Sequence, residues 1–303
     1  MKKTIIIIAV TSTLSGCLGS STVTPTIASA PSGTTYPNLN STAATISTLG
    51  GDTIRMNSTT EGISLATVSG SLDHKTKKHT FDDGKIALTD NNGFNADTLP
   101  KLVDDNDATL TISSPTTTDS GITGTYDYVR LYEANYTDPI SGEAIQNVGY
   151  FGVVTATADI PSTGKAAYAG GAAGITENKS TGVSLDLFGT SIVQVDFGTK
   201  YVQALIQNIT AKTTGENPVD AISPVDTITA INMEIKENRF RGGSILTILN
   251  ETPVSLTGTG TPVDVSQGTF FGYDTASSIP DEVAGLISRV GNGGNVAINY
   301  ISD

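Results

Sequence analysis

Apolar and polar positions alternate regularly in the C-terminal half of the chain. Residues 183–187, 193–197 and 202–206 each place an apolar side chain at every second position, with Ser, Asp, Gln or Leu between. A period of two leaves one face of a β-strand apolar and the other available to water. These three runs therefore predict neighbouring strands that each bury one face.

Two further patterns extend this region to the end of the chain. Glu237-Asn238 separates two apolar runs and predicts a hairpin turn, and residues 295–301 form a last strand after Asn292-Gly293-Gly294. About eight strands in succession predict an up-and-down β-barrel, because closure removes the exposed edges of a meander. We expect an eight-stranded up-and-down β-barrel over residues 151–303.

Shorter alternating stretches recur over residues 45–150. They occupy residues 63–68, 109–112 and 126–132. Glycine-containing turn signals stand between them, at Asp83-Gly84, Asn92-Gly93 and Ser120-Gly121. The chain is therefore predicted to be all-β, with a small antiparallel sheet domain at residues 45–150 preceding the barrel.

The N-terminus reads as a secretion signal ending at the only cysteine. Lys2 and Lys3 precede the apolar run 5–10, which leads to Leu14-Ser15-Gly16-Cys17. That run is shorter than the roughly 20 apolar residues that span a membrane as a helix. The last four residues are similar to a bacterial lipobox, which predicts a signal peptide at residues 1–16 and lipidation of Cys17. The alternative is a buried core cysteine.

The residues after the predicted cleavage site indicate in which membrane the protein is anchored. Leu18 follows the cysteine where inner-membrane lipoproteins of Gram-negative bacteria usually carry aspartate, which favours the outer membrane. Residues 17–44 are rich in Thr, Ser, Pro and Ala and almost free of charge, a composition typical of a flexible tether. We expect a body held to the outer membrane by its N-terminal lipid.

The charge and composition of the chain limit the classes of molecule that it is expected to bind. The formal net charge is −13, and removal of Lys2 and Lys3 with the signal peptide changes it to −13 − 2 = −15. An acidic chain without a basic cluster is a poor candidate for binding nucleic acid. Nucleic acid is therefore not an expected partner.

Candidate chemical sites are few. The two histidines, His74 and His79, flank three lysines, which disfavours a metal or haem site there; Asp104–Asp107 lacks the spacing of a calcium-binding EF-hand loop. No Gly-x-Ser-x-Gly nucleophile turn occurs. The sequence predicts no enzyme, no metal site and no cofactor, although a pair of carboxylates for glycoside hydrolysis stays open, because such a pair is defined by distance in space.

Two glycine-rich motifs about 100 residues apart carry a family resemblance. Residues 159–171 and residues 268–285, with Gly-x-Phe-Phe-Gly and Glu-Val-Ala-Gly, resemble the barrel of the transferrin-binding protein B and factor H-binding protein family of surface lipoproteins. The resemblance implies the same barrel over residues 150–303, and more loosely a handle-like sheet domain before it. The motif residues are Pro161, Gly164, Tyr168, Gly170, Gly268, Phe270, Phe271, Gly272 and Gly285.

The aromatic motif residues are interpreted as barrel core and strand packing, with a binding site as the alternative. In the family, partners bind to outer surfaces and loops. The resemblance implies a surface-displayed binding lipoprotein that captures a protein or an iron or haem source, served by a TonB-dependent receptor or a lipoprotein translocator. Transferrin is not expected, because the chain has one barrel where full transferrin receptors have two lobes.

Two other functions stay open from sequence. One is a structural surface-coat lipoprotein without a dedicated ligand, and the other is a lipocalin-like carrier of a small molecule inside the barrel. Loop length favours residues 73–107 and 133–147 as the place of a binding site.

Overall fold

The computed structural model of the 303-residue chain describes two antiparallel β units. The predicted signal peptide, Cys17 and the first part of the predicted tether lie outside the described residues. The described residues are 34–39, 45–57, 63–73, 78–82, 87–90, 101–103, 109–113, 126–137, 142, 144–178, 182–213, 219–221, 223, 225–249, 263–291 and 294–303.

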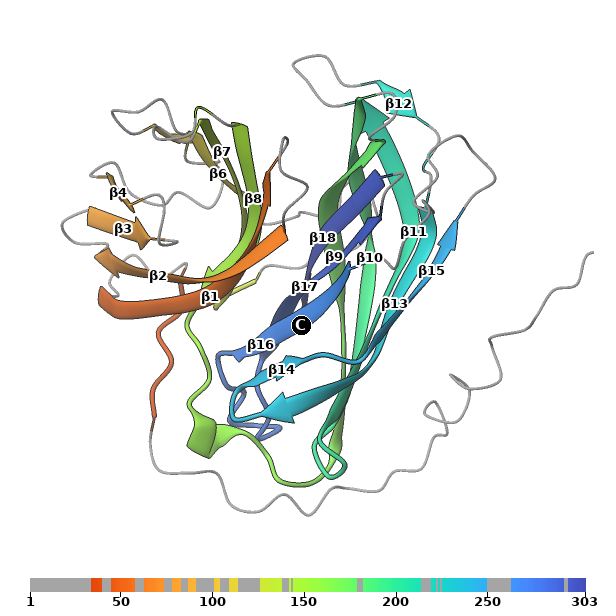
Figure 1. Ribbon diagram of the computed structural model, residues 1–303. Coiled ribbons are helices and arrows are strands. Elements are labelled where there is room, and N and C mark those ends of the chain that lie inside the picture. The colour runs from red at the N-terminus through yellow and green to blue at the C-terminus, as the bar shows by residue number, and fades with distance from the viewer. Residues whose placement is uncertain are drawn as a thin grey trace, which may run out of the picture.

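The N-terminal unit is one antiparallel sheet of eight strands (Figure 1). Its spatial order is β4-β3-β2-β1-β8-β7-β6-β5, so β1 and β8 meet in the middle although most of the sheet lies between them in sequence. The strands are β1 (Thr45–Asn57), β2 (Ile63–Asp73), β3 (Lys78–Asp82), β4 (Ala87–Asp90), β5 (Lys101–Val103), β6 (Thr109–Ser113), β7 (Val129–Thr137) and β8 (Ala144–Gly152).

The C-terminal unit is a closed barrel entered through the 3-10 turn η1 (Thr157–Asp159). Around the ring, β9 pairs with β10, β10 with β11, β11 with β13, β13 with β14, β14 with β16, β16 with β17, β17 with β18 and β18 with β9. The strands are β9 (Lys165–Asn178), β10 (Val183–Asp196), β11 (Tyr201–Thr213), β12 (Asp220–Ala221), β13 (Val225–Lys236), β14 (Arg239–Arg241), β15 (Ser244–Leu249), β16 (Val263–Phe271), β17 (Glu282–Gly291) and β18 (Gly294–Ser302).

The barrel has eight strand positions because two short strands, β14 and β15, together occupy one of them. β14 and β15 both pair with β13 and are separated only by Gly242-Gly243, both with φ of +83°, while the two-residue β12 only adds to the edge of β11. Glu237 has φ of +59° in the turn between β13 and β14, where a hairpin was predicted. The predicted all-β class and eight-stranded up-and-down barrel are confirmed.

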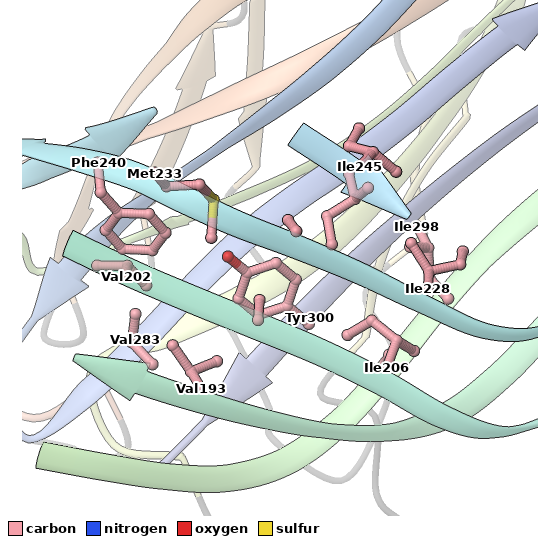
Figure 2. Close-up of a cluster of buried hydrophobic side chains, with 14 of the residues drawn as sticks. Val193, Val202, Ile206, Ile228, Met233, Phe240, Ile245, Val283, Ile298 and Tyr300 are labelled. Carbon is pink, nitrogen blue, oxygen red and sulfur yellow. The ribbon is translucent and has the colours of Figure 1, made fainter. Parts of the chain in front are cut away.

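Inward-facing side chains fill the barrel. Figure 2 shows this cluster, in which Met233 and Phe240 lie near one end and Ile206, Ile228 and Ile298 near the other, with Tyr300 between them. All six are fully buried, as the alternation of apolar positions along each strand requires. The interior is therefore a packed core.

A second apolar layer joins the barrel to the N-terminal sheet. Ile54, Val148 and Tyr150 of the sheet pack against outward-facing residues of the barrel, among them Leu286 and Ile301. Every residue of β18 is consequently buried, since one of its faces fills the barrel and the other meets the sheet. At about 25 cal/mol per Å² of apolar surface, such a layer strongly favours the docked arrangement.

The opposite face of the N-terminal sheet has its own apolar cluster. It contains Leu49, Leu72, Phe81 and Phe151, together with Leu39. Leu39 belongs to the described segment 34–39, which lies inside the predicted tether. The described part of the predicted tether is therefore packed against the folded body.

A pair of tyrosine variants tests the filled interior. The hydroxyl of Tyr300 is buried with no hydrogen-bond partner among the described residues, whereas that of Tyr168 donates to the carbonyl of Pro280 at 2.9 Å. We expect Tyr300→Phe to leave the free energy of unfolding unchanged or raise it by about 1 kcal/mol, and Tyr168→Phe to lower it by about 1 kcal/mol. Urea unfolding midpoints measure both, and a clear loss of stability in Tyr300→Phe would contradict the packing described.

Candidate functional site

The first family motif lies where the chain enters the barrel. Pro161 precedes β9, and Gly164 adopts φ of +95° while its carbonyl accepts the N–H of Phe197 at 2.9 Å. Tyr168 points into the barrel core. A Cβ on Gly170 would stand 2.0 Å from the carbonyl oxygen of Ile301, so this glycine permits the close approach of two strands.

The second motif supports aromatic rings. Added Cβ atoms on Gly268 and Gly285 would lie 2.1 Å from the ring of Phe240 and 2.3 Å from the hydroxyl of Tyr300, respectively. Gly272 has φ of +58° and lies beneath the ring of Tyr128. The structure thus gives these three glycines packing roles.

The two phenylalanines of the motif face opposite sides of β16. Phe270 packs inside the barrel near Phe197 and Phe240. Phe271 points outward to the sheet, with its ring edge-on to Tyr150 at 5.8 Å between centroids. Both are fully buried, so neither offers a surface to a partner.

The predicted polar and loop candidates are only partly described. His79 lies on β3, opposite Leu72, whereas His74 and Asp104–Asp107 lie outside the described residues. The described residues contain no group of three or more His, Cys, Asp or Glu side chains able to hold a metal ion. Within the same residues, no helix is long and apolar enough to span a membrane.

The predicted binding loops, residues 73–107 and 133–147, are described mainly where they form strands. Residues 74–77, 83–86, 91–100 and 104–107 of the first range and most of 138–143 in the second are outside the described set. Their part in binding stays a prediction.

One buried carboxylate of the barrel accepts hydrogen bonds from the N-terminal unit. Both oxygens of Glu282 face the start of β7: Oε1 accepts the N–H of Asp127, and Oε2 accepts those of Tyr128 and Val129 at 2.9 and 3.0 Å. Nearby, the guanidinium of Arg130 donates to the carbonyls of Tyr126 and Val129 at 2.6 and 2.8 Å. Glu282 thereby satisfies three backbone donors at the domain junction.

Burial dominates the ionisation of this carboxyl. It raises the pKa of Glu282, and the N–H donors of Asp127 and Tyr128 and the charge of Arg130 lower it again, leaving a value of about 8. Burial also raises the pKa of Asp281 and Asp303, and neighbouring aspartates raise both further. Ionisation of these carboxyl groups at this end of the junction therefore lowers the stability of the folded protein.

A second polar group crosses the junction at Asp52 of β1. Its Oδ1 accepts from Arg239 of β14 at 2.7 Å and its Oδ2 from the hydroxyl of Tyr150 at 2.7 Å. Tyr150 also lies 3.2 Å from the hydroxyl of Thr269 of β16. Since Asp52 is buried while Arg239 is partly exposed, these donors compensate its lost hydration.

Sequence reasoning missed both junction groups. Glu282 stood inside the quoted Glu-Val-Ala-Gly motif, where an acidic residue beginning a buried strand was the available signal. Asp52 follows Gly50-Gly51, a pair that suggests a turn, whereas the structure places it inside β1. No local signal relates Asp52 to Arg239, because 187 positions separate them.

The outer surface of β10, β11, β13 and β15 is left uncovered by the sheet. One register row crosses it: Ile192 pairs with Leu205, Leu205 with Thr229, and Thr229 with Leu246. Leu246 is 55% exposed. Residues in this row and the rows on either side are called the uncovered face; they are Thr190, Ile192, Gln194, Gln203, Leu205, Gln207, Thr227, Thr229, Ile231, Ser244 and Leu246.

The uncovered face contains no charged side chain in a chain that has 17 basic and 30 acidic residues. Charges bound it instead: the Lys165–Asp196 ion pair and Glu234 lie toward one end of the strands, and Asp186 and Lys212 lie toward the other. The cores of protein interfaces are likewise depleted in charged residues. The uncovered face has the composition of an interaction surface.

The ionisation of Glu282 predicts a pH dependence. With a pKa raised from 4.5 to about 8, the folded protein holds a proton that the unfolded chain has released between these values. Stability is therefore complete below about pH 4.5 and falls as pH rises toward 8, by up to about 1.4 kcal/mol per pH unit from this group. Urea midpoints across this range measure it.

Glu282→Gln should flatten that dependence, since it removes the titrating group, and the exposed Glu234→Gln is the matched control. An unchanged pH slope in Glu282→Gln would contradict the assignment.

No protein-family model matches the chain, and no curated protein matches it in sequence. Solved structures with a similar arrangement of strands include intact Ap-TbpB with its N and C lobes, at a TM-score of 0.49 and 17% identity, covering 84% of this chain and 45% of that one.

Two further structures are similar at the same level. Isotype 1 transferrin binding protein B from serogroup B Neisseria meningitidis gives a TM-score of 0.47 and 16% identity over 84% of this chain and 43% of that one. A tryptophan-to-alanine mutant of transferrin binding protein B from Haemophilus parasuis Hp5 gives 0.46 and 14% over 83% and 44%. The chain thus spans less than half the length of each of these three structures.

Proposed function

We propose that this protein is a lipid-anchored, surface-displayed lipoprotein of the outer membrane that binds another protein through the uncovered face. It acts without catalysis and without a cofactor. The observation that carries the proposal is the uncharged, partly apolar row from Ile192 to Leu246 on the outside of the barrel.

The size of the uncovered face suits the centre of a protein interface. Four strands about 4.8 Å apart and three rows about 6.8 Å apart cover roughly 400 Å². A stable interface buries about 800 Å² per partner, with an uncharged core and a polar rim. The charged residues at both ends of the strands supply such a rim. A surface-coat protein without a ligand has no need of this arrangement.

The shape of the face favours a protein over a small ligand. Small molecules bind in concave pockets that enclose them, whereas this is the outside of a barrel. The barrel interior is filled by side chains such as Phe240 and Tyr300, which counts against a lipocalin-like carrier. Under this proposal, the chain obtains iron or haem by binding a protein that carries it.

Charge favours a partner other than a second copy. Two chains with a formal net charge of −13 repel each other. A neutral or basic protein avoids this repulsion, and a basic one gains a faster encounter.

The lipobox at Leu14–Cys17 supports the anchor, and Leu18 supports the outer membrane. Delivery to the surface by a lipoprotein translocator, or cooperation with a TonB-dependent receptor, belongs to the same proposal. A gene for either beside the gene for this protein would support it.

Binding is tested by capture from the medium that surrounds the producing cell. We expect the wild-type chain to retain a protein partner and Leu246→Asp to weaken retention by roughly 30-fold, equivalent to about 2 kcal/mol, because it places a charge in the middle row of the face. Leu65→Asp is the matched control, since Leu65 is 47% exposed on the N-terminal sheet.

The alternatives give distinct results. No capture by the wild-type chain favours the coat protein, and equal loss in both variants moves the site away from the uncovered face. A dimer in sedimentation that Leu246→Asp abolishes makes a second copy the occupant.

The anchor is tested separately at Cys17. We expect Cys17→Ser to lose both labelling by palmitate and sedimentation with membranes, because three acyl chains hold a protein durably and none holds it at all. Protease added to intact cells measures display, and protection of the wild-type body would contradict surface exposure.

A further inference from the structure

Residues 34–39, here called the strap, contact both units of the body. Tyr36 lies against the barrel side: its hydroxyl donates to the carboxylate of Asp159 in η1 and accepts the N–H of Ala156 at 2.8 Å. Its ring stacks on that of Tyr273, in the connection between β16 and β17, at 6.1 Å between centroids. Asp159 is only 4% exposed, so the hydroxyl meets a buried carboxylate.

Three residues later the strap joins the other unit. The N–H of Leu39 donates to the carbonyl of Asp127 at 2.6 Å, and its side chain is 6% exposed in the apolar cluster of the N-terminal sheet. Asp127 is also one of the residues whose N–H binds Glu282. The strap is therefore attached next to the junction itself, by one polar and one apolar anchor.

We propose that the strap is a clamp that fixes one exit point for the N-terminal segment, at a defined end of the barrel. The clamp needs no external ligand, because both anchors are residues of this chain. Burial and Asp159 raise the pKa of Tyr36, so its hydroxyl keeps the donated proton throughout the ordinary pH range.

The position of the clamp distinguishes the two ends of the barrel (Figure 1). η1, the turn between β10 and β11 and the connection from β16 to β17 lie at the strap end, as do the last residues of β18. Asn178, Gly182, Thr213 and Gly294 lie at the opposite end. A body held by lipid at Cys17 then directs that opposite end away from the membrane. This orientation rests on the proposed anchor, whereas the clamp does not.

The orientation also bears on the uncovered face. Its strands run between the two ends, so the face stands along the side of the barrel and neither end covers it. With residues 34–39 fixed, only residues 17–33 separate lipid from body, roughly 20–25 Å on average for a flexible chain. The clamp thus sets how near the face is held to the membrane.

Amide hydrogen exchange tests the polar anchor. The experiment uses the mature chain with Cys17→Ser, without lipid or ligand, so failure of the proposed function leaves its outcome unaffected. Tyr36→Phe removes the acceptor of the Ala156 N–H and should accelerate its exchange on the order of tenfold. The neighbouring Thr155 N–H, which donates to Phe270 at 2.9 Å, should be unaffected. Tyr201→Phe, at an exposed tyrosine, is the matched control variant.

Spin labels test whether the exit point is fixed. Thr35→Cys supplies a label on the exposed part of the strap, paired in separate proteins with Tyr201→Cys at the strap end or Val183→Cys at the opposite end; both of these sites are about half exposed. We expect two narrow distance distributions, with the longer distance to residue 183, and broadening of both by Tyr36→Ala. Broad distributions in the parent chain, or exchange at Ala156 unchanged by Tyr36→Phe, would overturn the clamp.

Discussion

The burial of β18 on both faces is the constraint on which the rest of the structure depends. Its inward side chains, including Tyr300, belong to the barrel core, while Ala297 and Ile301 belong to the layer beneath the N-terminal sheet. Two cores therefore share one strand, and neither unit can separate without exposing apolar surface. Polar side chains that are buried on this strand need hydrogen-bond partners inside the protein. The side-chain amide of Asn299, for example, donates to the carbonyl of Gly149.

This constraint divides the molecule into a structural side and an available side. The buried carboxyl groups of Glu282 and Asp52 accept hydrogen bonds across the junction. In the described part of the chain they are engaged in holding the two units together. The uncovered face of the barrel has partly exposed apolar side chains, of which Leu246 is 55% exposed, and the strap does not cover it. The junction contacts and the proposed binding surface thus lie on different faces of one barrel.

Local pattern made the strands and the barrel predictable. Alternation at 183–187 and 193–197 determines which residues face inward, whatever their neighbours are. The same alternation predicted the last strand at residues 295–301, which is β18, but it did not predict that both faces are buried. Asn295 and Asn299 alternate with apolar residues as in a half-exposed strand, yet both are buried. Burial of the second face depends on β7 and β8 of the N-terminal sheet, which begin at Val129 and Ala144, far before β18 in the chain. Likewise, the glycine motifs were recognisable, but the rings lying on Gly268 and Gly285 come from distant strands.

The sequence by itself determined the strand periodicity and the meander of the barrel, because each depends on neighbouring positions; lipidation of Cys17 and the absence of catalysis stay predictions from local motif and composition. Only the tertiary structure decided the junction contacts, the clamp at Tyr36 and the row that joins Ile192 to Leu246. These require residues far apart in the chain to meet: 123 positions separate Tyr36 from Asp159 and 187 separate Asp52 from Arg239. Strand register sets such meetings, and register is a property of the closed barrel as a whole.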